Sequence, residues 1–250
     1  MAATTHPTRV QLFATCLVDH ICPEAGMAAV RLLERLGLTV EVPAGLTCCG
    51  QPAFNGGFRS EARTMARHTV DVLSASDAPI VVASGSCADM VVHRYPELLA
   101  NDPAYAGRAV DVAGRTYELS QFLVDVLGVT SLGATGHGTV AYHSSCHAQR
   151  GLGVRRQPLA LLAGVKGLSC LALPEAETCC GFGGLFAVKM PDISGAMLSR
   201  KLDNIEACGA DVVTGTDVSC LIHIGGGLRR RGSQVRVKYL AEILAPDRKP

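Results

Sequence analysis

The sequence predicts an α/β fold built from two similar halves, each a small parallel sheet with flanking helices. Three observations support this. One cysteine pattern occurs twice along the chain. Short runs rich in β-branched residues precede the cysteines, and amphipathic helical patterns lie between those runs. Strands that alternate with helices favour parallel sheets covered by helices.

The cysteine pattern is an internal repeat. Thr47-Cys48-Cys49-Gly50 recurs as Thr178-Cys179-Cys180-Gly181. The single cysteines on either side recur as well, at offsets of 130 to 133 residues, and pair Cys16 with Cys146 and Cys87 with Cys220. A repeat of this length indicates two copies of one structural unit. We predict a first cysteine-rich repeat over residues 1–130 and a second over 131–250, joined at a glycine-rich stretch.

Four short runs read as buried parallel strands, since they are rich in β-branched residues and end in small ones. They are residues 10–14, 80–82, 139–142 and 212–213. We expect the single cysteines to lie in the loops that follow these strands. Because the carboxyl ends of parallel strands meet at one edge of a sheet, these loops would converge there.

Three segments read as amphipathic helices between the strands. Residues 24–36 follow Pro23 and stop at Gly37, as helices often do. Residues 58–73 and 193–205 carry apolar side chains on one helical face. Each half therefore alternates strand and helix.

The cysteine content indicates metal chemistry. Eleven of 250 residues are cysteine, an odd number that suits a disulfide framework badly. Iron–sulfur clusters need about four thiolates that converge on one point, and each half supplies four. The eight candidate ligands are Cys16, Cys48, Cys49, Cys87, Cys146, Cys179, Cys180 and Cys220. A zinc-stabilised interaction scaffold is the alternative, although the chain has no Cys-x-x-Cys pair of the kind that zinc sites usually use.

Other cysteines and histidines are weaker candidates. Cys22, Cys170 and Cys208 lie outside the repeat, and we interpret Cys170 and Cys208 as small core residues. His143 and His147 flank Cys146 and fit ordinary hydrogen-bonding roles. His223 follows Cys220 by three residues, so it could share a helix face with that cysteine and act as a further metal ligand.

Composition excludes several classes of partner. The net charge is +1 and aromatic residues make up 4% of the chain, so neither a basic field nor stacking platforms for nucleic acid are present. The chain has no G-x-G-x-x-G after a strand and no Walker A motif. No transmembrane segment or signal peptide is predicted, because the longest apolar runs fall far short of the required length. We therefore expect a cytoplasmic protein.

The doubled pattern resembles the cysteine-rich CCG domain found in heterodisulfide reductase and in the iron–sulfur component of glycolate oxidase. Longer matches resemble the lactate utilization protein A family. The segments that carry this resemblance are residues 15–17, 47–53, 84–87, 143–147, 179–184, 188–191 and 224–232. They are specific and spread over nearly the whole chain.

This resemblance implies an iron–sulfur subunit of a complex that oxidises L-lactate to pyruvate. The cofactor implied is one or two [4Fe–4S] clusters, which relay electrons to partner subunits. Those partners are a ferredoxin-like iron–sulfur subunit and a smaller companion subunit. The chain would then be one part of an oxidoreductase, inactive alone, with no assigned catalytic residue.

The chain departs from the cysteine-rich domain of heterodisulfide reductase at one point. There, the last cysteine of each repeat belongs to a Cys-x-x-Cys pair, and five cysteines hold a non-cubane cluster. Here Met90 and His223 stand where the fifth thiolates would be. The four thiolates left in each repeat suffice for an ordinary [4Fe–4S] cluster.

Overall fold

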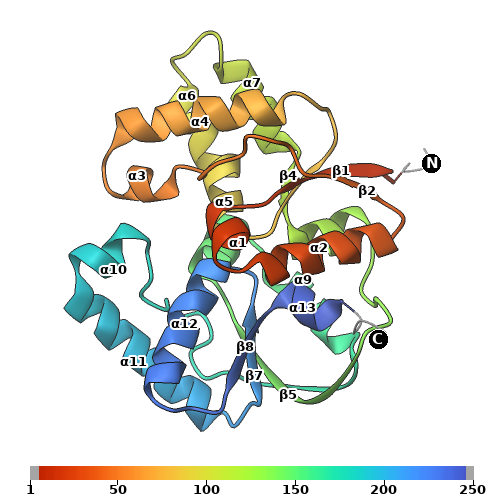
Figure 1. Ribbon diagram of the computed structural model, residues 1–250, viewed down its shortest axis with the longest axis vertical. Coiled ribbons are helices and arrows are strands. Elements are labelled where there is room, and N and C mark those ends of the chain that lie inside the picture. The colour runs from red at the N-terminus through yellow and green to blue at the C-terminus, as the bar shows by residue number, and fades with distance from the viewer. Residues whose placement is uncertain (1–5, 246–250) are drawn as a thin grey trace.

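The protein contains two four-stranded parallel sheets with the same topology (Figure 1). The computed structural model describes residues 6–245. Strand order is β2-β1-β3-β4 in the first sheet and β6-β5-β7-β8 in the second. In each sheet the first strand of that half lies between the second and the third. The predicted α/β fold with two similar halves is confirmed.

The first half begins with strand β1 and ends with the second of its two π-helical turns, η2. Its elements are β1 (Arg9–Phe13), α1 (Cys16–His20), α2 (Pro23–Arg35), β2 (Thr39–Glu41), α3 (Gln51–Asn55), α4 (Arg59–Leu73), β3 (Ile80–Val82), α5 (Gly85–Asp89), the π-helical turn η1 (Met90–Arg94), α6 (Tyr95–Leu99), α7 (Ala106–Gly114), β4 (Thr116–Glu118), α8 (Leu119–Gln121) and the π-helical turn η2 (Phe122–Val126).

The second half repeats this order with fewer helices. Its elements are β5 (Thr135–His143), the π-helical turn η3 (His147–Gly151), α9 (Arg156–Ala163), β6 (Lys166–Leu171), α10 (Leu185–Lys189), α11 (Pro191–Ala207), β7 (Val212–Gly215), α12 (Val218–Arg230), β8 (Arg236–Tyr239) and α13 (Leu240–Leu244). A bulge early in β5 shifts its register against β6 between Thr135 and Gly138.

The two sheets share one core. Alternate strand residues point to opposite faces, so Val10 and Leu12 of β1 pack into the same buried cluster as Val140 and Tyr142 of β5. Helices α2, α9 and α13 contribute side chains to this cluster and lie between the sheets. The opposite face of the first sheet packs against α4, α6 and α7, and that of the second against α11 and α12. The molecule is therefore layered, with helices outside and between two sheets.

The predicted strands and helices are present within a few residues of their expected bounds, but the expected loops are shorter. Cys16 begins α1 and Cys146 directly precedes η3, while Cys87 and Cys220 lie inside α5 and α12. Two or three residues separate β1, β3, β5 and β7 from the helix or π-helical turn that follows, so these four cysteines lie at the start of helical segments instead of in loops. Cys170 is exposed on the edge strand β6, so the prediction that it is a core residue is wrong.

No helix within residues 6–245 is both long enough and apolar enough to span a bilayer.

Candidate metal centres

The first half brings its four repeat cysteines together. Cys16 and Cys87 come from the helices that follow β1 and β3, and Cys48 and Cys49 come from the loop before α3. Because both strands are parallel and adjacent, their carboxyl ends deliver these cysteines to one edge of the sheet. The Sγ atoms of Cys49 and Cys87 are 3.3 Å apart. We call these four cysteines the first site.

The thiols of the first site hydrogen-bond to one another. Side-chain contacts with Cys16 and Cys49 lower the pKa of Cys48 to about 3. The same hydrogen bonds to Cys48, together with burial, raise the pKa of Cys16 and Cys49. Cys48 is therefore the thiol of this site that loses its proton most readily. A set of soft sulfur donors gathered in this way suits iron–sulfur chemistry or zinc.

A left-handed glycine bends the backbone after each cysteine pair. Gly50 has φ = 86° and Gly181 has φ = 90°, a conformation that favours glycine. This bend allows two adjacent cysteines to face one site, which a regular strand would prevent. The bend is fixed by hydrogen bonds: the buried Tyr95 hydroxyl donates to the Cys49 carbonyl at 2.9 Å, and Ser194 Oγ donates to the Gly181 carbonyl at 2.8 Å.

The second half repeats the arrangement with Cys146, Cys179, Cys180 and Cys220, which we call the second site. Cys146 and Cys180 donate hydrogen bonds to Cys179 and lower its pKa to about 2. Cys180 also hydrogen-bonds to Cys220, and its pKa is raised. The structure therefore gathers the eight predicted cysteines into two groups of four.

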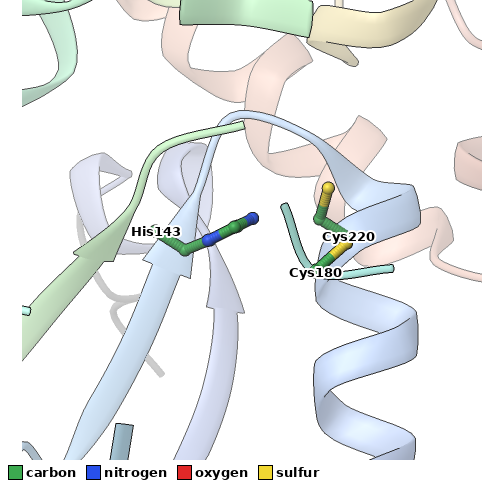
Figure 2. A group of neighbouring side chains, drawn as sticks. All are labelled: His143, Cys180 and Cys220. Carbon is green, nitrogen blue, oxygen red and sulfur yellow. The ribbon is translucent and has the colours of Figure 1, made fainter. Parts of the chain in front are cut away.

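The second site has a further donor that the sequence did not single out. His143 is the last residue of β5, and its ring points toward Cys180 and Cys220 (Figure 2). One ring nitrogen and the two sulfurs all lie within 4.8 Å of one another. Burial and the nearby Lys201 lower the pKa of His143 to about 4, so the ring is neutral at pH 7. The sequence feature that could have identified this donor is the position of His143 at the end of a buried strand, three residues before Cys146.

A buried lysine also lies beside the second site. Lys201 of α11 is 0% exposed, and its Nζ donates to the carbonyl of Glu175 at 2.6 Å. Burial lowers the pKa of Lys201, whereas the charges of Cys180, Cys179 and Cys220 raise it. The ammonium group therefore offsets part of the negative charge of these thiolates.

The predicted fifth ligand, His223, lies on α12 one turn after Cys220 and is half-buried. Its Nε2 is 3.4 Å from Ser194 Oγ, and its ring meets the edge of Phe182. It is not part of the His143 group. Cys22 directly precedes α2 and packs against the shared core, and Cys208 donates to the Ile205 carbonyl, so neither joins a site.

Two carboxylates tie the sites to each other. Asp217, before α12, accepts a hydrogen bond at 2.6 Å from the backbone N–H of Ser86, next to Cys87. Asp89, two residues after Cys87, contacts His147 Nδ1 at 2.6 Å, next to Cys146. Figure 1 shows α1 and α5 at the centre of the molecule, where the two halves meet. The two sites thus share one interface.

Comparisons agree with this geometry. The model of the cysteine-rich CCG domain matches residues 10–91 and again residues 140–225. The chain is 48% identical over 236 residues to lactate utilization protein A of Bacillus cytotoxicus and to that of Geobacillus kaustophilus, and each alignment covers 94% of this chain and 98% of the relative.

A solved structure shares the fold. A hypothetical protein from Helicobacter pylori superposes with a TM-score of 0.67 at 12% identity, over 98% of this chain. This chain spans about half the length of that protein, with 50% of it covered.

The repeated fold and its two four-cysteine sites define a cysteine-rich CCG-domain protein. Within that class, similarity over nearly the full length is decisive. The chain belongs to the lactate utilization protein A family.

Proposed function

We propose that this protein is an iron–sulfur subunit of a complex that oxidises L-lactate to pyruvate. The single observation that carries the proposal is the pair of four-thiol sites, one in each half. Cys16, Cys48, Cys49 and Cys87 would hold one [4Fe–4S] cluster, and their counterparts in the second half another. Bound clusters would supply one-electron transfer, which the side chains of this chain do not provide themselves.

The donor set fits such a group. Within each site the sulfurs are in hydrogen-bond contact with one another, as at Cys49 and Cys87, whose sulfurs are 3.3 Å apart. Cys49 and Cys180 are each 1% exposed, so the inner side of each site is shielded from water. Thiolates are soft donors that select iron–sulfur clusters or zinc over hard cations.

The rest of the proposal follows the family. Relatives are named for lactate utilization, so we assign lactate as the substrate of the whole assembly. The two CCG repeats, placed at residues 1–130 and 131–250, would pass electrons between a ferredoxin-like iron–sulfur subunit and a smaller companion subunit in the cytoplasm. The chain alone would not oxidise lactate.

Metal analysis tests the cofactor. Protein purified and reconstituted without oxygen should contain iron and acid-labile sulfide in equal amounts and should absorb visible light through sulfur-to-iron charge transfer. Stoichiometric zinc in a colourless protein would instead select the interaction scaffold.

Turnover tests the assignment to a complex. With an artificial electron acceptor, the purified chain should leave L-lactate unchanged, and activity should appear when the partner subunits are added. Lactate oxidation, or disulfide reduction, by the chain alone would contradict the proposal and identify the chain as an enzyme in itself.

A further inference from the structure

We propose that His143 is a metal ligand of the second site, so that this site binds its iron centre through imidazole as well as thiolate, whereas the first site uses thiolate alone. The proposal rests on the proposed function and deepens it, because it makes the two centres chemically different.

The imidazole of His143 is enclosed in the protein. His143 is 1% exposed, and within residues 6–245 neither its Nδ1 nor its Nε2 has a hydrogen-bond partner. A buried polar group without a partner is destabilising, and such groups are rare in native structures. A metal bound to one ring nitrogen would satisfy the atom that the fold leaves unpaired.

The His143 ring is directed at two of the sulfurs of the second site (Figure 2). The His143 ring extends from the end of β5 toward the sulfurs of Cys180 and Cys220, which come from a loop and from α12 (Figure 2). All three donor atoms lie within 4.8 Å of one another. Three separate elements therefore converge on one point with two sulfurs and one nitrogen, a combination typical of sites for iron or zinc.

The first half has an apolar ring at the position that matches His143. Phe13 ends β1 as His143 ends β5, and each precedes the first cysteine of its site by three residues. Phe13 is 0% exposed and packs against the core of the first half. A phenyl ring fills this position in one copy, so the fold does not itself require a polar ring there. The imidazole is thus present for metal binding at the second site and not for packing.

The other nearby histidine, His223, is less suited to be the metal ligand. His223 has a polar neighbour in Ser194 Oγ, 3.4 Å from its Nε2, and its ring packs on the edge of Phe182. It is also only half-buried, whereas His143 is fully enclosed. His223 therefore serves as the matched control for His143.

The centre takes about four protein ligands, so the imidazole would take the place of one of the four thiolates, and this exchange would change the electronic character of the iron–sulfur centre. A neutral nitrogen ligand brings less negative charge than a thiolate, and histidine ligation raises the reduction potential of such centres. Lys201, buried beside the same thiolates, acts in the same direction. We expect the second centre to be reduced at a higher potential than the first.

The experiment measures nitrogen coupling to a single centre. The full chain carrying Cys48→Ser and Cys49→Ser, which disables the first site, is produced with ¹⁵N-labelled histidine, reconstituted with iron and sulfide without oxygen, and reduced with dithionite. Pulsed electron paramagnetic resonance should show the strong coupling of a directly bound ¹⁵N nucleus. His143→Phe, which copies the first half, should lose this coupling and lower the potential, whereas His223→Gln should keep both.

The outcomes separate the two proposals. Iron and sulfide bound at the second site without histidine coupling would overturn the role of His143 and leave the iron–sulfur assignment intact. Absence of bound iron in the wild-type chain would overturn both. If His143→Phe does not fold, His143→Gln takes its place, and the labelled protein with native His143 still decides the question through its own coupling.

Discussion

The two cysteine sites share their backbone geometry but differ in what surrounds the sulfurs. In the first, Phe13 and Met90 are buried apolar residues at the positions that His143 and His223 occupy in the second. Thr69 of α4 stands where α11 carries the buried Lys201. The topology and the thiols are thus common to both halves, while the two histidines and the buried lysine are found only in the second. This difference indicates that duplication supplied two equivalent binding frames and that the side chains around them set the properties of each.

The largest expected effect comes from removing one thiol in each site in turn. Serine oxygen is a poor ligand for a soft metal, so Cys49→Ser and Cys180→Ser should each remove one centre and lower bound iron by about half. Iron and sulfide counts after anaerobic reconstitution measure this. The exposed Cys170→Ser is the control and should leave both values unchanged.

The same experiment can show whether the two sites are separate centres. If either single variant lost all its iron, the two sites would be halves of one centre, and their separate treatment would be wrong.

A smaller effect concerns two buried titratable residues that end the matching strands of the two sheets. Glu118 ends β4 and Tyr239 ends β8, and both are buried. Burial raises the pKa of Glu118 to about 7 from an ordinary 4.5. At Glu118 the folded state therefore holds a proton that the unfolded chain releases. The contribution of this residue to stability is present in full below pH 4.5 and is lost as pH rises through 7, by about 3 kcal/mol in all.

Denaturant unfolding at pH 5 and pH 8 measures that change. The change in the free energy of unfolding from pH 5 to pH 8 should differ between the wild type and Glu118→Gln by most of this contribution, because glutamine does not titrate. Tyr239→Phe should leave it as in the wild type. A pH dependence that survives Glu118→Gln would show that other groups cause it.

The smallest effect concerns the glycines that follow the cysteine pairs. Both adopt φ values that strain alanine by about 1–2 kcal/mol. A Cβ at Gly50 would lie 3.3 Å from Met65 Cβ, but one at Gly181 would lie 2.7 Å from the Ser194 carbonyl oxygen. Gly181→Ala should therefore lower the free energy of unfolding more than Gly50→Ala, by about a further 1–3 kcal/mol. Equal losses would show that the second bend relaxes as readily as the first.

Much of the architecture could be predicted from the sequence because the relevant signals are local. Runs such as Ile80–Val82 are uniformly apolar, and the 59–73 segment shows clear helical periodicity, so both elements were found. The offset of the cysteine pattern predicted the groups of four, because repeated spacing on a repeated fold brings the same positions together.

The rest depends on contacts between distant segments. His143 reads as an ordinary polar residue beside Cys146, and its importance appears only when β5, a loop and α12 meet. Cys170 ends an apolar run, but its strand lies at the edge of the sheet and turns that side chain outward, which no local pattern reveals. Helical spacing alone makes His223 a possible ligand, and α12 places its Nε2 3.4 Å from Ser194 Oγ.

Each half supplies one carboxylate to the other, and this arrangement bears on the ancestry of the chain. Asp217 serves the first half and Asp89 serves the second, whereas the positions that match them hold Ser84 and Ile222. A symmetric homodimer of a single ancestral repeat would have made each contact twice, but here each exists once and in one direction. The halves have therefore become complementary partners, like the two different chains of a heterodimer, and a protein shortened to either one would leave a backbone amide or an imidazole without its acid.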